Sequence, residues 1–321
     1  MSGRKSLVLF CALLAAFCAA RASAWQPGKA IEVVVPASEG GGADRMVRTV
    51  IRVIERERLC AQAFTVVNKP GGSGSEAYLY VKGKRGDDHV MLISLSSLFT
   101  LPIAMGTPFR PEEFTPLARL ALDEFVLWVN AAAPYRTTGE YVKALRASPG
   151  SFKMGGTGAG QEDQIVTVLF EQSAGVQFTY IPMGGGQNVA NALADRKVDS
   201  TVNNPSEAAD LWRAGKVRPL GLFDEQRIAL PKWKDIPTMK EQGYPASYLM
   251  MRSFFGPPGM SDQAAVYFRT LLKKVYDGAE FQGYLSDNAL KAAWLTGPEL
   301  ATWLASQDTL HQDLLNRTGM R

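Results

Sequence analysis

Residues 31–44, IEVVVPASEGGGAD, carry the pattern that decides the fold of this chain. The β-branched run from Ile31 to Val35 predicts a short, buried strand. A glycine-rich turn follows from Pro36 to Ala43, and the apolar residues after Asp44 recur at helical spacing. A strand, a glycine turn and a helix in this order are typical of one unit of an α/β fold.

The same unit recurs along the chain. Strands predicted at 64–67, 151–154 and 178–181 each lead into a glycine-rich turn, near residues 72, 157 and 185. Each turn is followed by residues whose apolar spacing predicts a helix. Alternating strands and helices predict mostly parallel sheets that are flanked by helices.

Such turns are suited to binding an anion. Glycine lets the backbone approach a ligand closely, and the start of the following helix presents free N–H groups at the positive end of its dipole. In open α/β sheets these turns lie at the carboxyl ends of the strands, where ligands bind. One turn of this kind is weak evidence, but several in one chain predict a cleft with hydrogen-bond donors on both walls.

The first 24 residues have the order of a secretory signal peptide. Arg4 and Lys5 precede an uncharged apolar run over residues 7–20, and the small-x-small sequence of residues 22–24 follows it. The apolar run is short for a membrane anchor, which is the alternative interpretation. We therefore expect cleavage after Ala24 and an exported, periplasmic product that begins at Trp25.

The charge and cysteine content exclude other classes of protein. The chain has a net charge of +4, and Arg4, Lys5 and Arg21 of the predicted signal peptide account for most of it. The remainder contains no basic block, which argues against a role on nucleic acid or on a membrane surface. Cys60 is the one cysteine after the signal segment, so an internal disulfide is excluded and the fold must depend on its core.

Several longer segments resemble one known family. These are residues 35–45 (VPASEGGGADR), 68–74 (NKPGGSG), 180–186 (YIPMGGG), 198–205 (VDSTVNNP) and 236–245 (IPTMKEQGYP). Together they are similar to the Bug-type substrate-binding proteins of tripartite tricarboxylate transporters, over nearly the whole mature chain. The resemblance implies a two-lobed periplasmic-binding-protein fold of the Venus-flytrap type (type II), with a two-crossing hinge. It places residues 25–120 and 246–321 in the first lobe and residues 121–245 in the second.

The resemblance also implies a function and a set of ligand contacts. The protein would capture a small carboxylate (a di- or tricarboxylate, an amino acid or an aromatic acid) for a membrane transporter, as a monomer and without a cofactor or metal. The contacts implied in the first lobe are Ser38, Gly41, Gly42, Gly72, Ser73, Gly74, Ser94, Ser96 and Ser97. Those implied in the second lobe are Thr157, Gly158, Ala159, Gln161, Met183, Gly185 and Asn203. Asp44 is expected to cap its helix, because one carboxylate repels another.

The sequence departs from the family pattern at positions that bear on the ligand. Ser73 stands where the family usually has glycine, and Asn203 replaces a common aspartate. Glu162 and Asp163 add negative charge at a predicted helix start, where a favourable interaction with the helix dipole is the simpler explanation. The alternative is that these two acids shape the cleft for a ligand with a cationic group.

An enzyme is the main competing class. His89 and His311 are too few and too far apart in sequence to indicate a metal site or a catalytic triad. The glycine loop at residues 155–160 has neither the spacing of a dinucleotide loop nor the Lys-Ser/Thr of a phosphate loop. Cys60 has no histidine near it in sequence, and the acids Asp44, Glu76 and Asp163 are explained by helix starts. We expect a binding protein, with a ligand sensor or an exported hydrolase as the alternatives.

Overall fold

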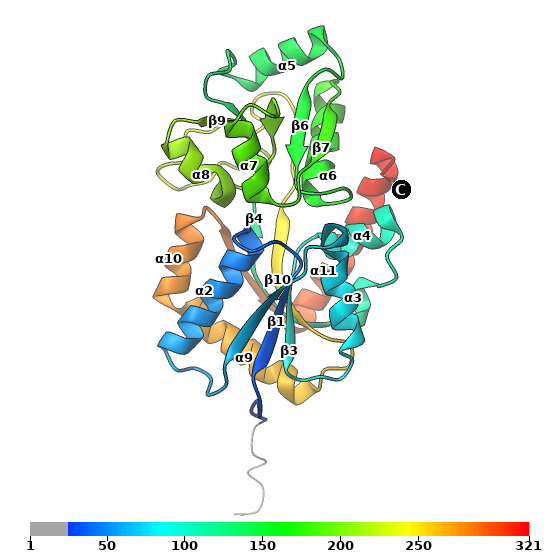
Figure 1. The fold of residues 1–321 in the computed structure, drawn as a ribbon, viewed down its shortest axis with the longest axis vertical. Helices are drawn as coiled ribbons and strands as arrows, with labels where there is room; N and C mark the ends of the chain where they lie inside the picture. The colour runs from blue at the N-terminus through cyan, green and yellow to red at the C-terminus, as the bar shows by residue number, and fades with distance from the viewer. Residues whose placement is uncertain (1–24, 321) are drawn as a thin grey trace, which may run out of the picture.

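The computed structural model describes residues 25–320, and it has two lobes that each contain one β-sheet (Figure 1). The predicted signal peptide, residues 1–24, lies outside the described residues. The prediction of a two-lobed α/β fold is confirmed. None of the helices between residues 25 and 320 is both long enough and apolar enough to span a bilayer.

The first lobe is built on a six-stranded sheet with the order β11-β4-β10-β3-β1-β2. Its strands are β1 (Ile31–Val35), β2 (Phe64–Asn68), β3 (Val90–Ser94), β4 (Thr115–Asp123), β10 (Met250–Gly256) and β11 (Lys291–Thr296). Its helices are α2 (Gly42–Arg56), α3 (Ser75–Gly83), α4 (Ser97–Met105), α9 (Asp262–Asp277), α10 (Ala279–Asp287) and α11 (Gly297–Thr318), with short 3₁₀ turns at η1 (Gly72–Gly74) and η2 (Pro111–Glu113).

The second lobe is built on a five-stranded sheet with the order β7-β6-β8-β5-β9. Its strands are β5 (Val126–Asn130), β6 (Lys153–Gly156), β7 (Thr179–Pro182), β8 (Ser200–Thr201) and β9 (Val217–Leu222). Its helices are α5 (Thr138–Ala147), α6 (Glu162–Ala174), α7 (Gly186–Ala194) and α8 (Pro205–Arg213).

The sheets are mixed, which corrects the expectation of mostly parallel strands. In the first sheet β1 pairs in parallel with β2 and β3, whereas β10 runs antiparallel to both β3 and β4. In the second sheet β6 pairs in parallel with β7 and β8, whereas β5 runs antiparallel to β8 and β9. The strands β10 and β5 belong to the segments by which the chain returns to the first lobe and enters the second, and these segments cannot follow the strand–helix–strand repeat. The strand β11 also runs antiparallel to β4.

The first unit of the chain folds as its sequence predicts. The strand β1 is buried at Val33, Val34 and Val35, because its β-branched side chains lie between the helices that cover both faces of the sheet. The apolar residues of α2, from Met46 to Ile54, face this sheet and are buried with it. The strand ends at Val35, and the glycine turn that begins at Pro36 carries the chain directly into the start of α2.

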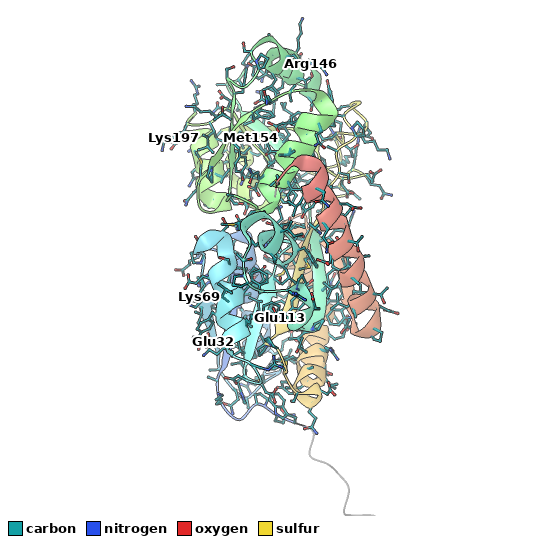
Figure 2. All side chains as sticks on the ribbon, turned by 90° about the vertical axis from the view of Figure 1, so that its right-hand side faces the viewer. Glu32, Lys69, Glu113, Arg146, Met154 and Lys197 are labelled. Carbon is teal, nitrogen blue, oxygen red and sulfur yellow. The ribbon has the colours of Figure 1, made fainter. Side chains whose placement is uncertain are left out.

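Two segments connect the lobes side by side. The chain leaves the first sheet at Asp123 and enters the second at Val126, and it returns from Leu222 to Met250. The amide of Phe223 donates to the carbonyl of Phe125, at 2.9 Å, and ties the two connections together. Figure 2 shows α11 along one side of the first lobe, with its C-terminal part beside α6 of the second lobe. Two adjacent connections permit rotation of the lobes about one hinge.

Candidate ligand-binding site

A cavity of about 570 Å³ lies between the two lobes. The turns after β1 and β2 and two residues of β10 line it from the first lobe, and the turns after β6 and β7 line it from the second. Its volume is in the range of cavities that hold a small organic molecule. The glycine turns that the sequence singled out therefore meet at one place.

The starts of helices from both lobes border this cavity. The N-cap residues Gly41 of α2, Gln161 of α6, Gly185 of α7 and Asn204 of α8 all line it. A helix start carries unpaired N–H groups and a partial positive charge, which favour an anion. The caps of α2 and α7 are glycines without a side-chain cap hydrogen bond, so their amides remain available to a ligand.

Two of the glycines have conformations or neighbours that other residues could not accept. Gly185 has φ of 138°, which L side chains rarely adopt. A Cβ on Gly42 would lie 2.6 Å from Nη2 of Arg252, so the missing side chain gives the arginine its place beside the start of α2. Ser73, where the family usually has glycine, keeps the left-handed conformation with φ of 58°.

The first-lobe wall, which we define as the start of α2 together with Arg252, is positively charged. Arg252 is buried and donates to Oδ2 of Asp123 through Nε, at 3.0 Å, and through Nη2. Burial raises the pKa of Asp123 to about 6 although Arg252 opposes the rise. The pair is therefore ionised at neutral pH, and Arg252 presents a fixed cation to the cavity.

The second-lobe wall, which we define as the starts of α6 and α8, carries three buried acids. Oδ2 of Asp163 accepts from the amide of Thr157 at 2.9 Å, and Oε1 of Glu162 accepts from the amide of Ser97 in the first lobe. Oε2 of Glu207 accepts from the side chain of Asn203 and from the amide of Asn204. Glu207 thus satisfies an amide at the start of α8, Asp163 satisfies one in the turn before α6, and Glu162 satisfies the first amide of α4 in the other lobe.

Burial perturbs the acids of α6. The pKa of Asp163 is raised well above its usual value by burial and then by the neighbouring charges of Glu207 and Glu162. The pKa of Glu162 is also raised by burial, although backbone amides, including that of Ser97, oppose the rise. Raised carboxyl pKa values in a cavity mark acids whose ionised form lacks a compensating cation.

The lobes contact each other around the cavity through several hydrogen bonds. Gln161 donates to the carbonyl of Ser73 at 2.6 Å, and Thr100 donates to the carbonyl of Gly160 at 2.7 Å. On the other side of the cleft, Arg45 donates to the carbonyl of Ser206 at 2.9 Å. The described conformation is therefore one in which the lobes are closed on each other.

The residues assigned to the ligand from the sequence divide into two groups. Those that line the cavity are Ser38, Gly41, Gly42, Ser73, Thr157, Gly158, Ala159, Gln161 and Gly185. Those that do not line it are Gly72, Gly74, Ser94, Ser96, Ser97, Met183 and Asn203. None of the second group lines the cavity, and its polar side chains bond to the protein itself.

The serines at the end of β3 and just after it bond to the protein itself in this structure. The hydroxyls of Ser94 and Ser97 hydrogen-bond to that of Tyr78, at 3.2 and 3.0 Å, and Ser96 accepts from the amide of Met251. Asn203 likewise donates inward, to the carbonyl of Gly186 at 2.9 Å. These side chains hold the turns in place from behind.

Several cavity residues were not found from the sequence, above all Arg252, Glu207 and Asn204. Arg252 is the one charged residue of the buried strand β10, and a lone charge in a buried strand is a signal that the sequence offered. The sequence from Asn204 to Glu207, NPSE, has the form of a capping box, which the structure contains at the start of α8.

The acid Asp44 lies within the first turn of α2 and does not line the cavity. It accepts hydrogen bonds from the amide of Gly40 and from Asn68 and Arg48. Burial alone would raise the pKa of Asp44, but these hydrogen bonds outweigh it and lower the pKa below its usual value. Asp44 thus fixes the glycine turn to its helix, without being the N-cap residue.

The two histidines and the cysteine considered as catalytic residues do not line the cavity. His89 accepts from the amide of Gly28, whereas His311 is buried and hydrogen-bonds to Tyr248 at 2.8 Å. Burial lowers the pKa of His311 to about 4. Cys60 lies outside the cavity lining, and the described part of the chain contains no group of three or more residues placed to hold a metal ion.

Comparison with known proteins identifies the family. The family model of the tripartite tricarboxylate transporter family receptor matches residues 48–319. A UPF0065 protein of Bordetella pertussis is 25% identical over 311 residues, which cover 96% of this chain and 93% of that protein.

Solved structures have the same fold. The periplasmic binding protein BugD has a TM-score of 0.85 at 19% identity and covers 92% of this chain and 99% of its own. The R. palustris protein Rpa4515, solved with adipate, has a TM-score of 0.85 at 21% identity and covers 91% of this chain and 98% of its own. The resemblance seen in the motifs is confirmed: the chain belongs to the tripartite tricarboxylate transporter receptor family of solute-binding proteins.

Proposed function

We propose that this protein captures a small organic carboxylate in the cavity between its lobes and delivers it to a membrane transporter. The observation that carries the proposal is the meeting of uncapped helix starts from both lobes, α2 and α7, at one cavity that also holds Arg252. Backbone amides and a guanidinium are the groups that bind carboxylates. The adipate bound to the similar protein Rpa4515 supports the same class of ligand.

Capture depends on the two lobes acting together. With the lobes apart, each wall offers half of the contacts, and a bound ligand bridges the walls and shifts the population toward the closed form. Hydrogen bonds between the lobes, such as those of Gln161 and Thr100, then form around the ligand. The closed form would present the surface that the membrane subunits recognise.

Other parts of the proposal concern the cell and the assembly. The product would be periplasmic after cleavage at Ala24, would act as a monomer and would catalyse no reaction. The ligand contacts proposed are the assigned residues that line the cavity. We place the lobe boundaries near residues 120 and 246, next to the ends of β4 at Asp123 and the start of β10 at Met250.

A thermal-shift screen tests the function. A panel of carboxylates that includes succinate, malate, adipate, L-glutamate and benzoate is added to the purified protein, with neutral sugars as controls. A ligand present at a hundredfold excess over its Kd should raise the Tm by about 5–10 °C. The proposal is contradicted if no carboxylate raises the Tm, or if a member of the panel is converted to a product.

A pair of variants ties the shift to the cavity. Gly158→Val adds a side chain whose Cβ would lie 2.8 Å from the hydroxyl of Ser73, across the cavity, and should abolish the shift. Gly28→Val adds the same side chain where no atom lies within 4 Å and should keep it. A shift that survives in both variants would place the ligand elsewhere.

A further inference from the structure

Two buried acids meet at the hinge between the lobes. Glu124 lies in the outgoing connection, between β4 and β5, and Asp224 lies just after β9 in the returning connection. The residues next to them, Phe125 and Phe223, form the hydrogen bond that ties the two connections together. The side chains of Glu124 and Asp224 are only 4% and 5% exposed. Two carboxyl groups are therefore buried at the place about which the lobes rotate.

One cation serves both of these acids. Nζ of Lys291, the first residue of β11, donates to Oδ2 of Asp224 at 2.6 Å and lies 3.9 Å from Oε1 of Glu124. Oε2 of Glu124 has no hydrogen-bond donor among the described residues. The next acid along the chain, Asp123, is already paired with Arg252. The ammonium group of Lys291 is thus engaged with Asp224, and Glu124 is buried without a cation in hydrogen-bond contact.

The closed conformation therefore favours a protonated Glu124. A buried carboxylate without a hydrogen-bonded cation is costly, and a proton between two facing carboxyl groups removes the repulsion between them. Burial, and then the charge of Asp224, raises the pKa of Glu124 to about 9, although Lys291 opposes the rise. Protonated Glu124 can donate a hydrogen bond to the facing carboxylate of Asp224, which ionised Glu124 cannot do.

We propose that closure of the lobes binds one proton at the hinge, held between Glu124 and Asp224, and that loss of this proton favours the open form. The groups that face Glu124 are Asp123 on β4, Asp224 after β9 and Lys291 on β11. With both hinge acids ionised, the two connections carry charges that repel each other where they lie side by side. With the proton in place, a hydrogen bond joins the connections instead.

The direction of the pH dependence follows from these contacts. In the closed form Glu124 keeps its proton up to about pH 9, whereas the ordinary pKa of a glutamate is 4.5. An open form that separates the two carboxyl groups returns Glu124 toward the ordinary value and releases the proton to the solvent. The ratio of closed to open protein should therefore fall as the pH rises between these values, by at most about tenfold for each pH unit.

Small-angle X-ray scattering of the ligand-free protein between pH 6 and pH 9 tests the proposal. The radius of gyration of the unmodified protein should increase with pH as the closed form is lost, with circular dichroism as the check that the protein stays folded. Glu124→Gln keeps a donor for Asp224 but cannot ionise, so its radius should stay at the low-pH value.

Glu171→Gln is the matched control for the hinge variant. Burial also raises the pKa of Glu171, but this acid lies on α6 and accepts from the amide of Phe178 within the second lobe. The control should therefore show the same increase in radius as the unmodified protein. Asp224→Asn removes the charge that repels ionised Glu124 and should also abolish the increase, which provides a second test if Glu124→Gln does not fold.

Two results would overturn the proposal. One is a radius of gyration that does not change with pH in the unmodified protein. The other is an equal increase in the unmodified protein and in both hinge variants, which would assign the pH dependence to other acids, such as Glu162 and Asp163 of the cavity. Because no ligand is used, either result leaves the proposed function to be judged by the carboxylate screen.

Discussion

The two walls of the cavity are built from the same sequence pattern and carry opposite charges. On the first-lobe wall, the turn of residues 36–41 opens into α2, whose start is uncapped by a side chain and lies beside Arg252. On the second-lobe wall, the turn of residues 155–160 opens into α6, whose first turn holds Glu162 and Asp163. The first-lobe wall offers free backbone amides to an anionic ligand, whereas the second-lobe wall already carries carboxylates of the protein.

The difference shows that a glycine turn before a helix is not by itself an anion site. The amides of a helix start attract a carboxylate, but a side chain of the helix itself satisfies them as well as a ligand does. At α8 the capping box between Asn204 and Glu207 has this effect. All three helices have an acid in their first turn, so the difference lies in where that acid is placed. Asp44 of α2 does not line the cavity, whereas Glu162 and Asp163 of α6 and Glu207 of α8 do.

The largest expected effect comes from removing the cation of the first-lobe wall. Arg252→Met leaves Asp123 buried without its partner and should lower the free energy of unfolding by about 3–5 kcal/mol. Urea denaturation at neutral pH measures the loss in the free energy of unfolding. The control is Arg213→Met, which breaks an exposed pair with Asp210 and should cost less than about 1 kcal/mol. Equal losses in the two variants would mean that Arg252 is not a fixed cation of this wall.

Removing a charge from the second-lobe wall should raise the free energy of unfolding, whereas removing the charge of Arg252 lowers it. Asp163 has a raised pKa in the folded protein, so the native state takes up its proton more readily than the unfolded chain, where the usual value is 3.8. Stability is therefore lost as pH rises from the unfolded pKa through the raised folded one. Asp163→Asn should stabilise the ligand-free protein at neutral pH, and the gain should vanish as the pH falls below the unfolded-state pKa of 3.8.

Urea denaturation of the Asp163→Asn variant at pH 8 and pH 4 measures this difference. Asp210→Asn, on the exposed face of α8, is the control and should change stability little at either pH. If Asp163→Asn were destabilised at pH 8, the surrounding hydrogen bonds would stabilise the ionised carboxylate of Asp163, and its burial would not be unfavourable.

A smaller effect is expected from crowding the first-lobe wall. In Gly42→Ala the new Cβ would lie 2.6 Å from Nη2 of Arg252 and displace the guanidinium from the start of α2. Ligand affinity should fall about tenfold, which corresponds to about 1.4 kcal/mol. Titration calorimetry measures the change, and Gly283→Ala in α10, with no atom within 4 Å of the added carbon, should bind normally. Normal binding by both variants would remove Arg252 from the ligand contacts.

The smallest expected effect concerns the contact between the walls. Thr100→Val removes the hydrogen bond to the carbonyl of Gly160 and should weaken ligand binding by about fivefold, through loss of about 1 kcal/mol from the closed form. Small-angle scattering should show a larger radius of gyration without ligand. Thr270→Val, which removes a hydrogen bond within α9, is the control. An unchanged affinity and radius would mean that this contact does not favour closure.

The strand–turn–helix units could be predicted from the sequence, but contacts between residues far apart in the chain could not. The turns at Gly41 and Gly185 follow their strands directly, so the strand–turn–helix pattern located them at the ends of the sheets. Arg252 reaches the same cavity from a strand more than two hundred residues further along, next to Asp123 of the outgoing connection. The position of Arg252 beside the cavity depends on the order of the strands in the sheet, so a local sequence pattern cannot predict it.

The predicted contacts that do not line the cavity have a similar cause. Ser94 ends the strand β3 and Ser97 follows it, but the hydroxyls of both hydrogen-bond to Tyr78 of α3. The helix α4, which begins at Ser97, was not predicted from the sequence, since Pro102 lies within it. Without that helix, its start could not be recognised as the group that Glu162 binds across the lobes.

A crystal structure of the protein with the ligand that copurifies with it, identified first by mass spectrometry, would locate the carboxylate of that ligand. We expect this carboxylate within about 3 Å of the backbone amides at Gly42 and Ala43 or of the guanidinium of Arg252. A carboxylate bound instead at the start of α6, or a ligand outside the cavity between the lobes, would contradict it.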